Sequence, residues 1–554
     1  MTGVKVAHTP DTSVSGKRSN ESTFAGTAGL LRLIARRDRF RTTAWILGVG
    51  TMGFYFANAI KLVAPNQEEL VSLTVMFADP IGRMMTGPGY GMDAPTHERF
   101  YSAGYVLFLY ILIALMSIFT VIRHTRADEQ AGRAELLRAN IVGRHAALTA
   151  ALIVTAVANV VAGVLVFGGS QAAGYAVTGS VLVAVGGVAT GLFFAGLAAV
   201  TAQLTSSSRS ASGLAGAILG IAYLVRMGGD MSEPGGSTLS WFSPLAWAQQ
   251  TAPYVLDRAW PLLLPTIGFV ALSGLGYWLS TQRDFNAGLL PPRLGRATAA
   301  PYLGTPLGHA WRIVRGTLRG WGLALVLTGF MYGAFSQAMI DTADSLPPEF
   351  SKLFAGHDFL LGYFAYMAVF MAIFVAATAV SGLSRIRSEE ESGRAEYGLS
   401  TPIGRTRWLT AHITIISVGV LLILAGTGVA MGLSATASLK EPVDGVMNDL
   451  ILASVHQLPA VLAIMGIVVA LYGWLPRASI ATGWILVGFA GAVSSFGQLL
   501  DLPQAVLNLN ILGHLSAYPV EPVDWTPVLW LTGIGCVGIA LGLVGWSRRE
   551  LNRA

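Results

Sequence analysis

The sequence of 554 residues has few charged residues and almost no cysteine. Asp, Glu, Lys and Arg make up only 12% of the chain, whereas a soluble globular protein carries about 25%. Together with 53% hydrophobic residues and a mean hydropathy of +0.58, this excludes a soluble enzyme, a disordered protein and a nucleic-acid-binding domain. The single cysteine, Cys536, cannot form an internal disulfide and provides no thiol metal site.

The hydrophobic residues are grouped into long runs without Asp, Glu, Lys or Arg. About 20 apolar residues cross the hydrocarbon core of a bilayer as a helix. We identify twelve such runs, of which the fifth is short and rich in glycine: 43–60, 100–122, 146–168, 175–203, 211–225, 259–280, 321–340, 359–384, 408–433, 450–475, 478–500 and 525–546. The sequence therefore predicts an all-α polytopic membrane protein with twelve transmembrane helices.

The basic residues are divided unevenly between the two sides of the predicted membrane. If the N-terminus is cytoplasmic and the spans alternate, 29 of the 36 Lys and Arg residues lie inside and 7 outside. Short cytoplasmic loops carry an excess of Lys and Arg, so we predict that both termini are cytoplasmic.

The N-terminal region has two parts before the first span. Residues 1–23 are polar and predict a disordered cytoplasmic tail. In residues 24–42, leucine, isoleucine and phenylalanine alternate with arginine, which favours a basic amphipathic helix in the membrane interface. The alternative is a basic flank to the first span. A similar segment, 306–320, precedes the seventh span.

The chain contains one internal repeat. The segments DEQAGRAELLRANIVGR (128–144) and EEESGRAEYGLSTPIGR (389–405) agree at seven of seventeen positions with an offset of 261, each after the second span of six. We therefore predict two six-helix halves, 24–280 and 306–554, in the same orientation. Residues 281–305 would form a cytoplasmic linker between them.

The repeated segments lie in the predicted cytoplasmic loops 123–147 and 385–407. Glu129 and Arg133 are four residues apart, as are Glu390 and Arg394, a spacing that supports a short helix through ion pairs. A single charged loop is usually just a solvated surface. Because the pattern occurs in both halves, we favour a docking element that is presented twice to a cytoplasmic partner.

The chain carries no recognisable source of energy or catalytic motif. A G-x-x-x-x-G-K-[ST] phosphate loop, an HExxH motif and a nucleophile elbow are all absent from the sequence, and no cytoplasmic segment is long enough for an ATPase domain. Ion-driven carriers usually place ionisable residues inside their spans. The predicted spans contain only His412 and His456, each near the end of its span, where a lone histidine is expected to be interfacial or packed. A sodium site built from hydroxyl and carbonyl oxygens remains an alternative, because such a site needs no charged residue.

The pattern E-x-x-G-R-A-E, closed by G-R and present after spans 2 and 8, resembles that of the permeases of actinobacterial ABC exporters for multidrug and polyketide-antibiotic (tetronasin-type) efflux. The resemblance covers nearly the whole chain and implies the type-2 ABC exporter fold. In that fold the loop is a coupling helix that docks on a separate ATPase. The residues implied to dock are Glu129, Gly132, Arg133, Glu135, Glu390, Gly393, Arg394 and Glu396.

The resemblance also implies partners and substrates. Two copies of a cytoplasmic ATPase would bind ATP and Mg, with no cofactor on this chain, in a bacterial plasma membrane. The substrates would be hydrophobic or amphipathic drugs, polyketide antibiotics or lipids, with no nucleic acid, and the outer segments 226–258 and 501–524 would be re-entrant. Residues implied to face the pathway are Phe108, Tyr110, Met116, Phe119, Tyr366, Met367, Phe370 and Phe374.

An ion-coupled secondary transporter with twelve spans is the alternative. That class also has two six-span halves and a charged motif after span 2, which runs G-x-x-x-D-(R/K)-x-G-R-(R/K). In this chain His124 occupies the position of the first glycine of that motif, and the spacing from Asp128 to Gly132 is one residue longer than the motif requires. The departure favours the exporter.

Overall fold

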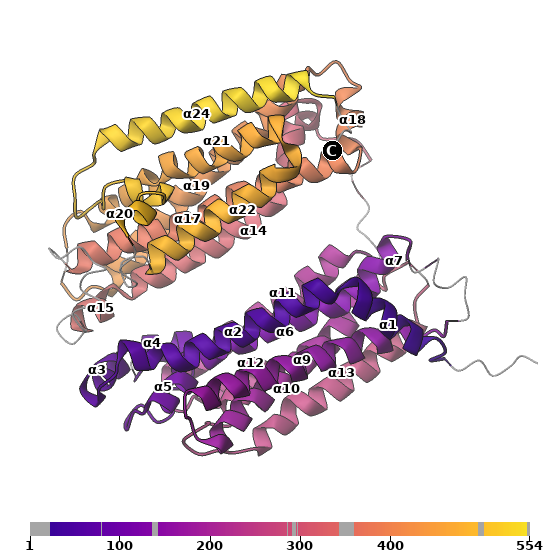
Figure 1. Cartoon of the computed structure of the whole chain (residues 1–554), viewed down its shortest axis with the longest axis vertical. Coiled ribbons are helices and arrows are strands. Elements are labelled where there is room, and N and C mark those ends of the chain that lie inside the picture. The colour runs from indigo at the N-terminus through magenta and orange to yellow at the C-terminus, as the bar shows by residue number, and fades with distance from the viewer. Residues whose placement is uncertain are drawn as a thin grey trace, which may run out of the picture. The chain divides into compact units, whose positions relative to one another are not determined.

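The structure is a computed structural model that describes residues 23–78, 80–133, 135, 142–284, 286–290, 295, 297–342, 359–441, 443–496 and 503–550. The chain folds as two compact units, Met1–Leu294 and Gly295–Ala554, whose boundary falls within the predicted linker 281–305. Apart from Thr23, the predicted N-terminal tail lies outside the described residues. All regular elements in the described residues are helices (Figure 1).

The helices of unit 1 are α1 (Thr27–Arg37), α2 (Arg39–Val63), α3 (Gln67–Ala78), α4 (Pro80–Thr86), α5 (His97–Gly104), α6 (Val106–Ile122), the π-helix η1 (Arg123–Ala127), α7 (Asp128–Gln130), α9 (Ala146–Ala172), α10 (Val177–Leu204), α11 (Ser208–Ser232), η2 (Thr238–Phe242), α12 (Pro244–Gln249), η3 (Trp260–Leu262) and α13 (Leu263–Thr281). Those of unit 2 are η4 (Pro301–Gly304), α14 (Pro306–Ala334), α15 (Ser336–Thr342), α17 (Phe359–Glu391), α18 (Arg394–Leu399), α19 (Arg405–Ser438), α20 (Val446–His456), α21 (Leu458–Trp474), α22 (Pro476–Phe496), α23 (Gln504–Leu507), η6 (Ile511–His514) and α24 (Trp525–Arg548).

In the described part of the chain, eleven helical segments are long and apolar enough to cross a membrane. They correspond to the predicted spans except the seventh, 321–340. α14 lies there and is 29 residues long, but its first half carries Arg312, Arg315 and Arg319. The structure thus has the helices of a multi-pass membrane protein, while the count of twelve stays a prediction.

The predicted fifth span is shorter than the helix that contains it. We expected 211–225, free of charge, but α11 continues to Ser232 and includes Arg226 and Asp230. Both side chains are fully buried and form an ion pair at 2.9 Å. The difference arises because Arg226 and Asp230 end the uncharged run in the sequence, whereas the backbone of α11 remains helical through both residues.

Segment 61–99 contains α3, α4 and the start of α5. The Arg83 Nε of α4 donates to the backbone carbonyl of Asp230 at 3.1 Å. This contact fastens α4 to the end of α11. The expected re-entrant segment 226–258 contains the short helices η2 and α12.

Glycine permits the close packing of α10 in unit 1, because small residues let membrane helices approach one another closely. A Cβ at Gly186 would lie 2.5 Å from the Tyr110 hydroxyl, and one at Gly191 would lie 2.5 Å from the Asn159 amide oxygen. Asn159 in turn hydrogen-bonds with Ser117 on α6, at 3.0 Å. In Figure 1, α2, α6, α9, α10 and α13 form this bundle, with α10 in contact with α6, α9 and α13.

The amphipathic segments have different shapes in the two units. In unit 1 the segment 24–42 forms α1 and the start of α2, separated by a break at Asp38. The apolar face of α1 buries Leu30 and Ile34. In unit 2 the corresponding segment 306–320 forms the first part of α14, which has no such break.

Candidate functional site

The chain makes the same turn after α7 and after α17. Each helix ends two residues before a glycine, Gly132 or Gly393, and both glycines have a φ of +71°. The N–H of Gly132 donates to the carbonyl of Glu129 at 3.0 Å, and that of Gly393 donates to the carbonyl of Glu390 at 2.9 Å. L side chains rarely adopt this left-handed conformation, which accounts for the glycine in both segments.

The glutamates at the start of the two turns point into the protein. The side chain of Glu129 is 14% exposed and that of Glu390 is 3% exposed. Each carboxylate pairs with the arginine three residues earlier, Arg126 at 2.9 Å and Arg387 at 3.4 Å. The glutamates are therefore held inside their units and are not presented at the surface.

An arginine from the last long helix of each unit completes the arrangement. Arg283 follows α13 and lies 2.6 Å from the carboxylate of Glu129. Arg549 follows α24 and lies 2.8 Å from that of Glu390. We call Arg126–Glu129–Arg283 the first brace and Arg387–Glu390–Arg549 the second brace. Each brace ties the glycine turn to the last long helix of its unit.

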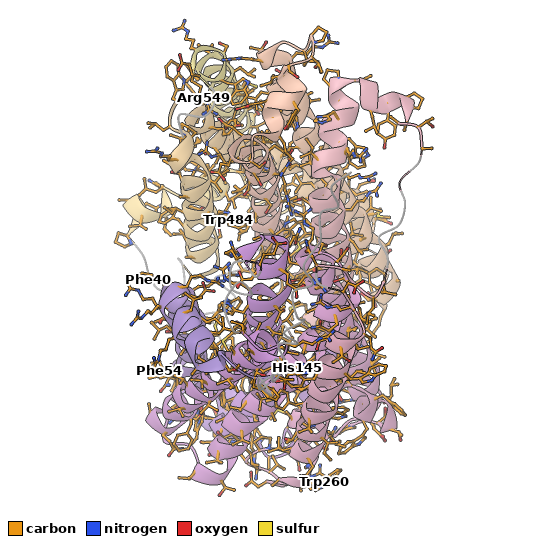
Figure 2. The ribbon with its side chains drawn as sticks, turned by 90° about the vertical axis from the view of Figure 1, so that its right-hand side faces the viewer. Phe40, Phe54, His145, Trp260, Trp484 and Arg549 are labelled. Atoms are coloured by element: carbon orange, nitrogen blue, oxygen red, sulfur yellow. The ribbon has the colours of Figure 1, made fainter. Side chains whose placement is uncertain are left out.

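The second brace has further polar and aromatic partners. The Tyr472 hydroxyl donates to the Glu390 carboxylate at 2.8 Å. The guanidinium of Arg549 lies 5.1 Å from the ring centroid of Tyr472 and 4.7 Å from that of Trp546. Figure 2 places Arg549 at one end of unit 2. A buried carboxylate needs such partners, because desolvation of an unpaired charge is costly.

The structure corrects the predicted pairing of residues four apart, which was Glu129 with Arg133 and Glu390 with Arg394. Arg133 instead lies 2.8 Å from Asp128, and Arg394 lies 2.7 Å from Glu389. The glycine turn ends the helix between the members of each predicted pair, so they are no longer one helical turn apart.

The remaining residues that were predicted to dock lie on the solvent-exposed side of the two turns. The side chains of Arg133 and Arg394 are 51% and 54% exposed, and Glu135 and Glu396 are exposed. The hydrogen bond with Glu389 raises the pKa of Arg394. α18 adds Tyr397, which is 79% exposed and which sequence reasoning missed. An aromatic residue inside a charged loop was the available signal.

Asp38 connects the break between α1 and α2 to the end of α6. Its buried carboxylate accepts a hydrogen bond from Arg123 at 3.0 Å. Burial raises the pKa of Asp38, but the bond from Arg123 and the nearby positive charges outweigh it and lower the pKa. Arg37 of α1 donates to Asp128 at 2.8 Å. Sequence reasoning missed the contact between Arg123 and Asp38, although Asp38 is the one acidic residue in 24–42.

The side chains predicted to face a pathway occupy different environments. Tyr110 and Met116 are buried in unit 1, where the Tyr110 hydroxyl donates to the carbonyl of Val183 at 3.2 Å. Phe108 and Phe119 are 36% and 37% exposed. The four predicted side chains of unit 2 are all partly exposed: Tyr366, Met367, Phe370 and Phe374.

Long apolar helices, with arginine–glutamate clusters at their ends, define a multi-pass helical membrane protein. No three His, Cys, Asp or Glu side chains within the described ranges are placed to hold a metal ion.

The chain belongs to the multidrug efflux permease family of Rv1217c, which confirms the predicted family. It is 36% identical over 535 residues to the multidrug efflux system permease protein Rv1217c of Mycobacterium tuberculosis (strain ATCC 25618 / H37Rv), and the match covers 96% of each chain. The family model for the C-terminal domain of that permease matches residues 303–547.

Proposed function

We propose that the chain is the permease subunit of an ATP-driven ABC exporter that moves hydrophobic or amphipathic compounds out across the bacterial plasma membrane. The observation that carries this proposal is the pair of matching glycine turns, each braced from inside and each exposing an arginine and a glutamate. A rigid surface presented twice suits two copies of one partner. The efflux permease name of the relative supports export of drugs.

In this proposal the partner is a cytoplasmic ATPase that binds ATP and Mg. The loops 123–147 and 385–407 transmit its motion, with both termini of the permease on the same side. Glu135, Glu396 and Tyr397 would contact the ATPase, because these side chains are exposed. Glu129 and Glu390 would instead hold the turns in shape, which changes the role that the sequence suggested for them.

The buried pair of Arg226 and Asp230 is the observation that favours an ion-coupled transporter, since ionisable residues inside spans often mark ion pathways. Their arrangement argues against this role. The Asp230 carboxylate is bound by Arg226 at 2.9 Å and by the Ser240 hydroxyl at 2.6 Å. Asp230 also lies two residues before the end of α11, where it fastens α4. We therefore assign this pair to structure.

The proposal predicts that transport needs ATP and a second protein. The permease is co-purified with a candidate ABC ATPase subunit from the same genome and reconstituted into vesicles, and uptake of a fluorescent drug into inverted vesicles is measured. We expect uptake with MgATP and none with an imposed proton or sodium gradient alone. Uptake that is driven by either gradient in the absence of ATP would replace the exporter with the ion-coupled alternative.

A second prediction concerns docking. The double variant Glu135→Lys, Glu396→Lys is expected to weaken the affinity for the ATPase about tenfold, which corresponds to about 1.4 kcal/mol, because both charged contacts are reversed. Less ATPase should therefore co-purify. Tyr397→Ala should weaken docking through the loss of an aromatic anchor. The control is Glu441→Lys, an exposed glutamate beyond the opposite end of α19. Normal co-purification by the double variant would remove these turns from the interface.

A further inference from the structure

The chain just before α1 is held against the end of the first loop, 123–147. The N–H of Gly143 donates to the carbonyl of Ala25, and the N–H of His145 donates to that of Thr23, both at 2.9 Å. A Cβ at Gly143 would lie 2.2 Å from the Thr23 carbonyl oxygen, so this close approach needs glycine. The glycine that closes the repeated sequence pattern therefore lets the chain before α1 lie directly on the loop.

The other end of α1 is held against the start of the same loop. Arg37 donates to Asp128 at 2.8 Å, and the carboxylate of Asp38 accepts from Arg123 at 3.0 Å. α1 thus joins both ends of the loop. We call residues 23–38 the strap.

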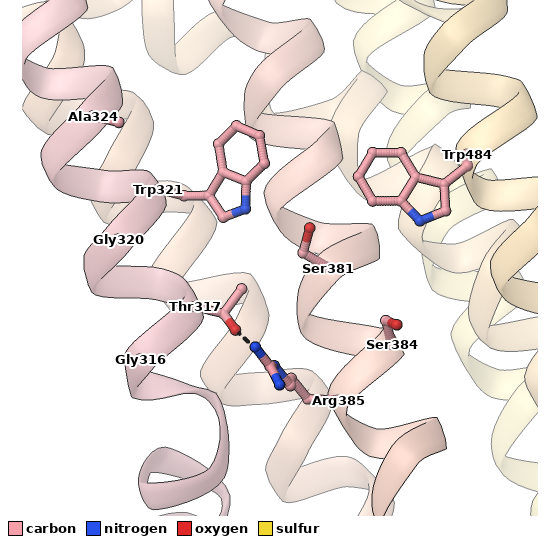
Figure 3. A pocket seen from close by; sticks show the side chains of 9 residues that line it. All are labelled: Gly316, Thr317, Gly320, Trp321, Ala324, Ser381, Ser384, Arg385 and Trp484. Atoms are coloured by element: carbon pink, nitrogen blue, oxygen red, sulfur yellow. Dashed lines mark hydrogen bonds between the residues drawn. The ribbon is translucent and has the colours of Figure 1, made fainter. Parts of the chain in front are cut away.

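In the described part of unit 2, the second loop, 385–407, has no equivalent strap. Gly404 occupies the position of Gly143 in the repeat, but a Cβ there would meet nothing within 4 Å. α14, the counterpart of α1, contains no Asp or Glu. The end of α17 meets α14 through a bond from the Arg385 Nε to the Thr317 hydroxyl at 3.2 Å, within one continuous helix (Figure 3). The two loops therefore differ in how they are held.

A cavity of about 550 Å³ lies beside the strap. Its lining comes from α1, the first glycine turn and the start of α9, and includes Leu33, Asp128 and Arg144. Segments with few packing contacts open more readily than a filled core does. The position of the first loop therefore depends strongly on the contacts at the two ends of the strap.

The surface that α1 and the start of α2 leave exposed is basic. On the covered side, Leu30 and Ile34 of α1 pack with Ala146 and Ala150 of α9. Four exposed arginines form what we call the basic face: Arg32, Arg36, Arg39 and Arg41. Within the described residues, none of the four forms an ion pair with a carboxylate. The basic face is therefore open to an anionic partner.

Apolar side chains beside these arginines indicate that the partner is a membrane surface. Leu33 is 42% exposed and Phe40 is 77% exposed, and Figure 2 shows Phe40 on the outside of unit 1. α2 begins at Arg39 and is long and apolar enough to cross a membrane, so the basic face lies where a span enters the bilayer. Anionic phospholipid headgroups attract basic residues at that depth, and the lipid chains cover apolar ones. An acidic soluble protein would match only the charge.

We propose that the basic face binds anionic phospholipids of the cytoplasmic leaflet, and that this binding fixes the strap and with it the first loop, 123–147. The second loop, 385–407, does not respond because no strap connects its ends to such a surface. Anionic lipid therefore acts on one of the two glycine turns, although the turns themselves match. The proposal uses the predicted orientation of the chain and goes beyond the export function, since it holds for any transported molecule.

The test compares trypsin cleavage at two matched arginines. Arg133 and Arg394 occupy the same position in the two turns and are 51% and 54% exposed. The full-length permease is placed in nanodiscs of phosphatidylcholine, alone or with one quarter phosphatidylglycerol, and cleavage is followed by mass spectrometry. We expect phosphatidylglycerol to slow cleavage after Arg133 at least fivefold and after Arg394 less than twofold, because cleavage requires local opening of the turn. Equal slowing at both sites, or none after Arg133, would overturn the proposal.

Substitutions separate lipid binding from its effect on the loop, with bound phosphatidylglycerol counted by native mass spectrometry. Replacement of the four arginines of the basic face by glutamine should remove at least one bound lipid and the slowing after Arg133. Gly143→Ala should keep the lipid but reduce that slowing at least twofold, because the methyl group displaces Thr23. The matched variant Gly404→Ala should change neither. Slowing that survives loss of the basic face would contradict the proposal.

Two further controls address the source of the anion and the choice of arginines. Glycerol 3-phosphate has a phosphate but no lipid chains, and it should not slow cleavage in phosphatidylcholine nanodiscs. If it does, the basic face binds a soluble phosphate and the lipid assignment is wrong. The triple variant of the corresponding segment of unit 2 should keep the full effect of phosphatidylglycerol: Arg312→Gln, Arg315→Gln and Arg319→Gln.

The comparison of lipids uses the unsubstituted chain, so the proposal is tested even if a variant does not fold. None of these measurements needs an ATPase. A failure of ATP-driven uptake with an intact lipid effect would therefore count against the export function and not against the strap.

Discussion

Glu390→Gln is expected to lower the free energy of unfolding by about 3–5 kcal/mol, the range seen when one partner of a buried ion pair is removed. The Glu390 side chain is 3% exposed, and it faces Arg387 and Arg549, which are 9% and 16% exposed. The neutral amide removes the counter-charge that the two guanidinium groups share and leaves Arg387 with only the exposed Glu391, at 2.9 Å. The hydrogen bond from Tyr472 survives in the variant, so the loss reports chiefly on charge.

The measurement is equilibrium unfolding in mixed micelles, with Arg394→Gln as the matched control. Arg394 pairs with Glu389 at the surface, where an ion pair contributes about 0–1 kcal/mol. Glu129→Gln should fall between the two because Glu129 is 14% exposed. A loss of less than 1 kcal/mol for Glu390→Gln would mean that the second brace does not stabilise unit 2.

The sequence located the glycine turns but not the direction of their glutamates. Identical residues at an offset of 261 marked both loops, and the structure has the same φ at Gly132 and Gly393. The second arginine of each brace, however, lies 154 or 159 residues away, just beyond the end of another helix. Only tertiary packing brings Arg283 and Arg549 to the glycine turns, so a single sequence offers no signal for this part of the braces.

The sequence predicted each helix only as far as its uncharged apolar run extends. A search for uncharged runs necessarily stops before a charge, and it therefore missed the last turns of α11, which contain Arg226 and Asp230. The same rule left Arg385 outside the eighth span, although α17 continues past it to Glu391.

Gly542→Ala is expected to lower the free energy of unfolding by about 1–3 kcal/mol, the cost of overpacking a well-packed interface. A Cβ at Gly542 would lie 2.3 Å from the backbone carbonyl oxygen of Val469. α21 and α24 approach closely along this line, where Gly538 would meet the backbone of Gly466 in the same way. Figure 1 shows the two helices side by side. Gly533→Ala on the same helix is the control, since its Cβ would meet nothing within 4 Å.

The position of Arg549 extends this prediction to the second brace. Arg549 directly follows α24, so a methyl group that pushes α24 away from α21 also draws the guanidinium away from Glu390. Gly542→Ala and Glu390→Gln should then be non-additive, with the second change costing at least 1 kcal/mol less in the presence of the first. Gly533→Ala and Glu390→Gln should add within about 0.5 kcal/mol. Additivity in both pairs would show that α24 can shift without disturbing the turn.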